Sequence, residues 1–210
     1  METISKDKIS FEIESKLKFI KKLLIFIIIF VFILNAKNVA KIFFPLKYKN
    51  SVVNYSKEFN LDPYLVAAVI KTESNFNLEA KSNKNAYGLM QITSDTGEWA
   101  AEKMGIKDFH TNLLYDPQFN IRMGCWYLDN LRKEFNGNMD LVLAAYNGGR
   151  GNVQKWLNDS DHSLDGQNLH NIPFKETEDY LKKVKLNYKI YKFLYGSNTK
   201  QYTIYLKNLH

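Results

Sequence analysis

The sequence is poor in several residue types, and each shortage excludes a class of protein. Four prolines and ten glycines in 210 residues exclude collagen-like chains and proline-rich or glycine-rich low-complexity chains. The single cysteine, Cys125, excludes a disulfide scaffold and any zinc site built on several cysteines. Because an exported chain tolerates one buried thiol, Cys125 leaves the cellular compartment undecided. The remaining composition, 45% hydrophobic and 24% charged, fits one globular domain with an appendage.

Arginine is also scarce, which bears on the choice of partner. Only three of the 29 basic residues are arginines, and the lysines behind the net charge of +7 are spread along the chain. Proteins that read nucleic acids rely on arginine for contacts to bases and phosphates, so we expect no nucleic-acid partner. The four histidines form no pair at the spacing i, i+4, and phosphate-loop and dinucleotide motifs are absent. We therefore expect neither a metal site nor a cofactor.

The longest apolar run lies near the N-terminus, where twelve apolar residues extend from Leu23 to Leu34. Twelve residues are too few to cross a bilayer, and this length also suits a signal-peptide core or a buried helix. Further apolar residues on both sides nevertheless allow a membrane helix of about 20 residues from roughly Phe19. We therefore expect a membrane signal-anchor over residues 19–44, with a cleaved signal peptide and a buried helix as the alternatives.

The lysines ahead of this run predict how the anchor is oriented. By the positive-inside rule they keep residues 1–18 cytoplasmic and place the C-terminal part of the chain outside. The chain would then be a single-pass protein of a cytoplasmic membrane. A short linker over residues 36–49 would connect the anchor to a folded domain at residues 45–196.

The signals within this domain are helical. Asp62-Pro63 and Asp116-Pro117 each place an N-cap aspartate before a proline at the first helical position. Asn50 is a further N-cap candidate, and apolar residues recur at helical spacing, whereas no alternating strand of useful length appears before residue 200. We therefore predict a mostly α fold with a polar surface loop at residues 158–171. The tail at residues 197–210 is predicted to be either frayed or a short strand. The predicted helices cover residues 50–59, 63–73, 117–135, 140–146, 152–157 and 176–195.

Glu73 is the strongest candidate for chemistry. It follows Ile70 and Val69 by three and four residues, so its side chain continues the apolar stripe that faces the core. Burial disfavours the charged carboxylate, and the negative end of the helix dipole acts in the same direction, so we expect a raised pKa. A carboxylic acid that stays protonated near neutral pH suits general-acid catalysis. The alternative is a solvated side chain at a fraying helix end.

Three further motifs follow Glu73 in an order that is known from one family. The four ordered motifs are Glu73-Ser74 at a helix end, GLMQIT at residues 88–93, AAYNGG at residues 144–149 and PFKETEDY at residues 173–180. With them the chain, from about Tyr48 to Tyr195, resembles the soluble-type lytic transglycosylases, glycoside hydrolase family 23 of the lysozyme-like superfamily. The resemblance implies a mostly helical, lysozyme-like catalytic domain. It also implies a bacterial protein that acts on the cell wall, so that the membrane would be a bacterial cytoplasmic membrane.

The resemblance also implies roles for individual residues. Glu73 would be the single catalytic acid and then the base. Seven residues are candidates for binding the substrate or for positioning Glu73: Ser82, Met90, Gln91, Tyr146, Asn147, Glu176 and Tyr180. Amide and hydroxyl groups of this kind suit sugar hydroxyls and N-acetyl groups. For Met90, Tyr146 and Tyr180, packing in the core is the alternative.

The implied reaction is a cleavage without water, carried out by a monomer on peptidoglycan glycan strands. Glu73 would protonate the bridging oxygen of the β-1,4 bond between N-acetylmuramic acid and N-acetylglucosamine, and a 1,6-anhydro end would result. One alternative is a lysozyme-type muramidase that hydrolyses the same bond. Its best second carboxylate is Asp95, although Asp95 is more simply interpreted as a helix N-cap. The other alternative is a membrane-tethered glycan-binding protein without turnover.

Overall fold

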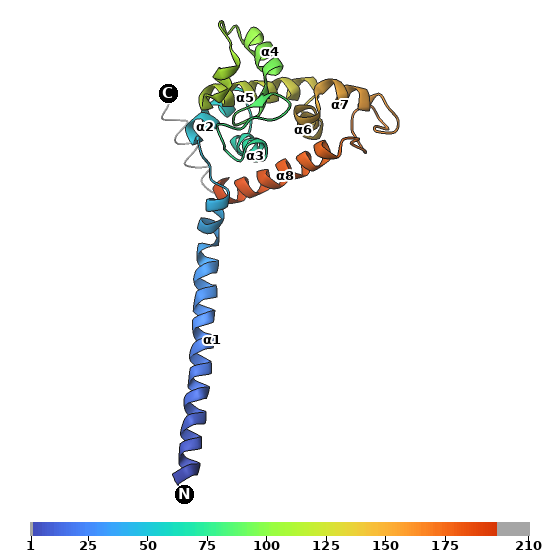
Figure 1. Cartoon of the computed structure of the whole chain (residues 1–210). Coiled ribbons are helices and arrows are strands. Elements are labelled where there is room, and N and C mark those ends of the chain that lie inside the picture. The colour runs from blue at the N-terminus through green and yellow to red at the C-terminus, as the bar shows by residue number, and fades with distance from the viewer. Residues whose placement is uncertain (1, 197–210) are drawn as a thin grey trace. The chain divides into compact units, whose positions relative to one another are not determined.

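The computed structural model describes residues 2–196, so the tail at residues 197–210 lies outside the described residues. The chain divides into two compact units, the first ending at Pro45 and the second beginning at Leu46. The first unit consists of one helix, α1 (Glu2–Phe43), and the second combines helices with one small sheet (Figure 1).

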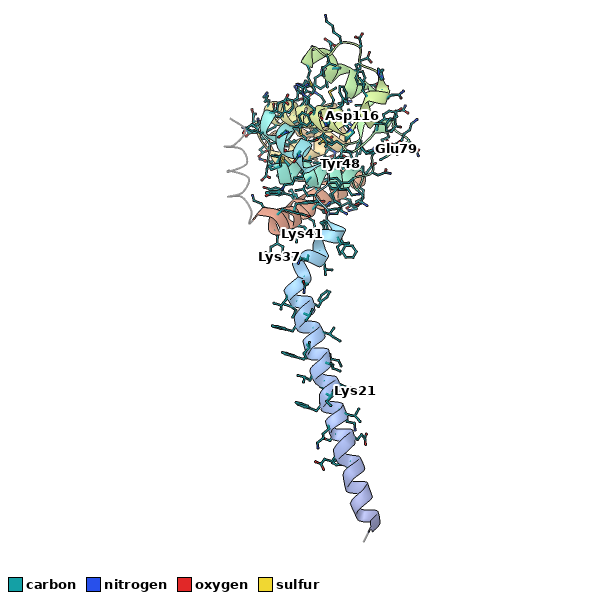
Figure 2. All side chains as sticks on the ribbon, turned by 90° about the vertical axis from the view of Figure 1, so that its left-hand side faces the viewer. Lys21, Lys37, Lys41, Tyr48, Glu79 and Asp116 are labelled. Carbon is teal, nitrogen blue, oxygen red and sulfur yellow. The ribbon has the colours of Figure 1, made fainter. Side chains whose placement is uncertain are left out.

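Helix α1 corrects two predictions made from the apolar run. The expected linker over residues 36–49 is helical as far as Phe43. In residues 2–196 no helix combines the length and the apolar character that crossing a membrane requires. The unbroken apolar run spans only about 18 Å as a helix, against about 30 Å of hydrocarbon. Lys21 and Lys37 stand on the same helix on either side of it (Figure 2). The predicted signal-anchor and single-pass location are therefore not supported.

The second unit is mostly helical, as predicted. Two strands of two residues each, β1 (Ala86–Tyr87) and β2 (Ile92–Thr93), pair antiparallel between its second and third helices. One 3₁₀-helix, η1, covers Thr111–Tyr115. The α-helices are α2 (Lys49–Glu58), α3 (Pro63–Glu73), α4 (Ser94–Met104), α5 (Pro117–Glu134), α6 (Met139–Gly148), α7 (Arg150–Leu157) and α8 (Lys175–Tyr195).

Two of the predicted helix caps are confirmed. The Asp62 carboxylate accepts a hydrogen bond from the Tyr64 amide at 2.8 Å and begins α3. In the same way the Asp116 carboxylate accepts from the Phe119 amide at 2.7 Å and begins α5. Each cap satisfies an amide that has no partner within its own helix, and the proline that follows needs none.

Two other predicted caps are wrong. Helix α2 begins at Lys49 after Tyr48, whose backbone has a φ of 51°, so Asn50 already lies inside the helix. Helix α4 is capped by Thr93, whose hydroxyl accepts from the Thr96 amide at 3.2 Å. Asp95 consequently lies in the first turn of α4, where its negative charge interacts favourably with the helix dipole but does not cap the helix.

Helix α3 is the central element of the core, and α8 packs along it (Figure 1). All residues of α3 from Tyr64 to Ile70 are buried, so neighbouring elements surround the helix. Polar bonds fix α8 against it: Asn187 Nδ2 donates to Thr72 Oγ1 at 2.9 Å, and the Tyr188 hydroxyl donates to Asp62 Oδ2 at 2.8 Å. The two bonds fix α3 at both ends, and the one to Thr72 lies directly before Glu73 at the C-terminal end.

Helix α5 crosses the same core and contains the one cysteine. Cys125 is fully buried there. Burial holds the pKa of its thiol well above the usual range, since the charged thiolate would lose its hydration.

Candidate active site

A cleft of about 370 Å³ opens beside the end of α3. Its walls come from the loop before β1, from β2, α4, α5, the end of α6 and the start of α7, and from the start of α8. The lining is mainly polar and aromatic, which suits a ligand with many hydroxyl and amide groups. The lining residues are Lys84, Gln91, Ile92, Thr93, Thr96, Tyr127, Tyr146, Asn147, Gly148, Gly149, Asn152, Phe174, Glu176 and Thr177.

Glu73 is the last residue of α3 and lies just behind this lining. Its side chain is partly buried, and it interacts electrostatically with two residues that face the cleft, Tyr146 and Glu176. Burial raises the pKa of Glu73 to about 7, and the negative charge of Glu176 acts in the same direction. A nearby hydroxyl, that of Tyr180, opposes the rise. The raised pKa that the sequence predicted is therefore present, and burial is its main cause.

Two tyrosines surround the Glu73 carboxyl. The Tyr146 hydroxyl donates a hydrogen bond to the Met90 carbonyl oxygen at 2.8 Å. Tyr180, on α8, is buried, and within the described residues its hydroxyl forms no hydrogen bond, although it lies close enough to Glu73 for the two groups to influence each other's pKa. Burial and the nearby Glu73 charge raise the pKa of both phenols well above the usual value, so both remain neutral donors.

The loop from Gly88 to Gln91 contributes Gln91 to the cleft wall, and a buried asparagine holds this loop in place. Asn120, on α5, accepts from the Met90 amide at 2.8 Å and donates to the Tyr87 and Leu114 carbonyl oxygens at 2.9 Å and 2.8 Å. Gly88 has a φ of 69°, and a Cβ there would lie 2.3 Å from the Leu114 oxygen. Only glycine fits this close approach, because any side chain would collide with the backbone.

Gln91 ends this loop with a left-handed backbone, at a φ of 49°. Its Nε2 donates to the Ala80 and Gly88 carbonyl oxygens, both at 3.0 Å. Because the amide nitrogen is used within the loop, the side-chain oxygen is the atom of Gln91 that is left to accept a bond from a ligand in the cleft.

Three of the seven candidates do not line the cleft: Tyr180, which lies behind it beside Glu73, and Met90 and Ser82. Met90 is fully buried, and a Cβ at Gly124 would lie 2.3 Å from its sulfur, so its side chain fills the space above α5. Ser82 accepts from the amides of Lys84 and Ala86, each at 3.2 Å, and closes the turn before β1. Asp95 is exposed on α4 and does not line the cleft either.

Tyr146, Asn147 and Glu176 lie on the cleft wall formed by α6 and α8. Asn147 Oδ1 accepts from the buried Thr177 hydroxyl at 2.8 Å, which joins the two helices. Glu176 is exposed and pairs with Lys84 across the cleft at 3.0 Å. The structure thus brings Gln91, Tyr146, Asn147 and Glu176 to one cleft, with Glu73 and Tyr180 directly behind it.

The sequence interpretation missed several lining residues. Phe174 and Thr177 stand within the quoted PFKETEDY stretch, so the motif held a signal for them. Nothing in the sequence marked Lys84, which lies in a polar loop, or Tyr127, which lies among the buried residues of α5, as part of the site. The other missed lining side chains are Ile92, Thr93, Thr96 and Asn152.

The chemical groups gathered here are carboxyl, hydroxyl and amide groups. Within residues 2–196 no three His, Cys, Asp or Glu side chains come together as a metal site. A carboxyl group with a pKa of about 7 can both release and accept a proton near neutral pH. The cleft beside it offers paired donors and acceptors to a polar ligand.

The family model described as Transglycosylase SLT domain matches residues 50–168. The soluble lytic murein transglycosylase of Salmonella typhimurium is 34% identical over 67% of this chain and 22% of its own. That of Escherichia coli K12 is 32% identical over 73% of this chain and 24% of its own. The chain therefore spans about a quarter of the length of these relatives.

Solved structures match over the same region. A structure of an inactive mutant of the lytic transglycosylase Slt from Pseudomonas aeruginosa has a TM-score of 0.64 and 34% identity over 72% of this chain and 25% of the other. The 70 kDa soluble lytic transglycosylase of Escherichia coli has a TM-score of 0.65 and 30% identity over 73% of this chain and 25% of the other. The latter protein has also been solved in complex with bulgecin A.

Proposed function

Because the chain belongs to the Transglycosylase SLT domain family, we propose that it is a peptidoglycan lytic transglycosylase with Glu73 as its acid and then its base. The predicted family and the mostly helical lysozyme-like fold are confirmed by the family match and the solved structures. The proposed substrate is the glycan strand of bacterial peptidoglycan, and the proposed product is a strand that ends in a 1,6-anhydro sugar.

One observation carries the proposal: Glu73 has a pKa of about 7 beside a polar cleft. Most glycosidases need two carboxyl groups at a set separation. A single carboxyl group can replace that pair only if it is protonated when the bond breaks and ionised when the product closes. A pKa near the working pH makes both states accessible to the same residue.

The proposed reaction proceeds in two steps. Glu73 protonates the oxygen that leaves from C1 of N-acetylmuramic acid, while the N-acetyl oxygen of that sugar attacks C1 and forms a cyclic intermediate. The Glu73 carboxylate then removes the proton of the 6-hydroxyl, whose oxygen bonds to C1 as the N-acetyl oxygen leaves. The Tyr180 hydroxyl stabilises the intermediate carboxylate by donating to it, since it faces Glu73 with no other partner among the described residues.

The relatives support this assignment. Two of them are named soluble lytic murein transglycosylases. The Pseudomonas aeruginosa relative is inactive as a mutant in which glutamate is replaced by glutamine. Asp95, the second carboxylate that a hydrolytic mechanism would have used, does not line the cleft.

Mass spectrometry of fragments released from purified peptidoglycan by the full chain tests the proposal. Fragments lighter by one water than reducing-end fragments are expected, and the Glu73→Gln protein should release none above background. Reducing-end fragments would instead identify a muramidase. Binding of glycan strands without any product, from wild type at every pH, would identify a binding protein.

A further inference from the structure

Arg150 stands at the rim of the cleft. It is the first residue of α7, and the cleft lining includes Gly149 before it and Asn152 after it. Its side chain is 47% exposed. An exposed guanidinium between two lining residues is accessible to a ligand that fills the cleft.

Two contacts hold this guanidinium in place. Its Nε pairs with Glu134 Oε2 at 3.1 Å, and its central carbon lies 5.4 Å from the centre of the Trp99 ring. Both contacts restrict the rotamers of a long side chain, which lowers the entropy lost on binding. Among the described residues the two terminal nitrogens of the Arg150 guanidinium have no partner, so both are available to a ligand.

The same wall continues from Arg150 to the catalytic centre. The Trp99 ring packs edge-on against Tyr127 at 6.2 Å, and the Tyr127 ring lies 5.3 Å from that of Tyr146. The positive charge of Arg150 also acts to lower the pKa of Tyr127, which burial raises to about 12. Arg150 is thus an electrostatic neighbour of Tyr127 in the cleft wall, and Tyr127 contacts Tyr146, which is in turn a neighbour of Glu73.

The other two arginines differ from Arg150. Arg122 donates from both Nε and Nη2 to Glu58, and Arg132 donates from the same two atoms to Asp129. Each of these guanidinium groups uses a terminal nitrogen in an ion pair on the helix surface. Arg150 keeps both of its terminal nitrogens for another acceptor.

We infer that Arg150 binds a carboxylate of the peptide stem carried by the glycan strand in the cleft. The inference rests on the proposed function, because it takes peptidoglycan as the substrate. Each N-acetylmuramic acid of that polymer bears a peptide with free carboxylates, whereas the sugar backbone between the stems is uncharged. The planar fork of arginine matches a carboxylate in geometry and charge. Arg150 is therefore a specificity-determining residue for stem-bearing strands.

The test compares two substrates that differ only in this charge. One is a set of glycan strands with intact stems, and the other is the same set with the stem carboxylates converted to amides. With the full chain, Arg150→Met should lower kcat/KM about tenfold on the intact strands and leave it unchanged on the amidated ones. Arg122→Met is the matched control, because it removes an arginine outside the cleft and should change neither value.

Two results would overturn the inference: an equal loss on both substrates, or no loss on either. Thermal unfolding of Arg150→Met excludes misfolding as the cause of a loss. Binding of both strand types to Glu73→Gln, with and without Arg150→Met, repeats the comparison without turnover. If the wild type forms no anhydro ends, the proposed reaction fails. A charge-selective loss of binding would still support the role of Arg150, and an unselective one would refute it.

Discussion

Two glutamates lie at the cleft in contrasting surroundings, one buried and one exposed. Glu73 ends a buried helix, and desolvation raises its pKa to about 7. Glu176 lies in the first turn of α8 with 68% of its side chain exposed, and Lys84 Nζ lies 3.0 Å from its carboxylate. The two residues share one chemistry and differ in their access to water and to a counter-charge. Burial, more than membership of the cleft, is what makes a carboxyl group a proton donor near neutral pH.

The largest expected effect comes from removing each acid in turn. Glu73→Gln should lower the release of anhydro-ended fragments by about 10²-fold to 10⁴-fold, because the transferable proton is lost. Glu176→Gln should lower it by less than about tenfold, since that group is solvated and acts on Glu73 only through its charge. Initial rates on purified peptidoglycan give both values. Similar losses from the two variants would break the distinction.

The next effect concerns the loop beneath the buried acid. Gly88→Ala should lower the free energy of unfolding by about 3 kcal/mol, because its Cβ meets the Leu114 oxygen at a left-handed backbone position. Gly137→Ala is the matched control: its φ is 78°, and nothing lies within 4 Å of its Cβ. There only strain of about 1 kcal/mol is expected. Urea unfolding measures both, and equal losses would mean that the close approach at Gly88 has no cost.

A third effect is a pH-dependent change in stability. The folded pKa of Glu73, about 7, lies above the value of about 4.3 in an unfolded chain, so the folded state holds the proton more tightly. Stability is therefore lost as the pH rises between these two values. Glu73→Gln should be more stable than wild type by roughly 3 to 4 kcal/mol at pH 8 and nearly equal to it near pH 4. Urea unfolding at both pH values measures the difference.

Glu79→Gln provides the control for this pH experiment. Glu79 lies exposed on the surface of the helical unit, shortly after α3 in the chain (Figure 2). The same exchange there removes a carboxyl group that water can reach, so no pH-dependent gain is expected. A gain at pH 8 in the Glu79 variant would attribute the effect to net charge and not to burial.

The smallest effect is expected at the exposed rim. Lys84→Met removes the partner of Glu176, but both side chains are about 70% exposed, and exposed ion pairs contribute little. The free energy of unfolding should change by less than about 0.5 kcal/mol. A loss above 1 kcal/mol in urea unfolding would show that the pair across the cleft is a structural element.

Local patterns in the sequence predicted part of this fold. An aspartate before a proline predicted the starts of α3 and α5, because capping depends on residues that are adjacent in the chain. The apolar stripe predicted the raised pKa of Glu73, because residues three and four positions apart share one face of a helix and this spacing is visible in the local sequence. The start of α2 was not predictable in this way, since the left-handed backbone at Tyr48 has no local signal.

Other parts of the site depend on contacts between distant residues. Asn120 holds the Met90 amide thirty residues away, and no periodicity marks a buried asparagine as a loop support. Lys84 meets Glu176 across 92 residues of sequence. The motif stretches suggested that Met90 faces the substrate, yet its side chain fills a gap above Gly124. Such side-chain directions follow from packing, which a linear pattern does not contain.

Cys125 is a natural probe of transient unfolding in this chain. The thiol is completely buried on α5 and stays protonated, so oxidants and alkylating reagents have no thiolate to attack in the native protein. It is also the only cysteine in the sequence, so a single modification site exists. The rate at which a thiol reagent labels the intact chain therefore reports how often the helices around α5 separate, without any engineered label.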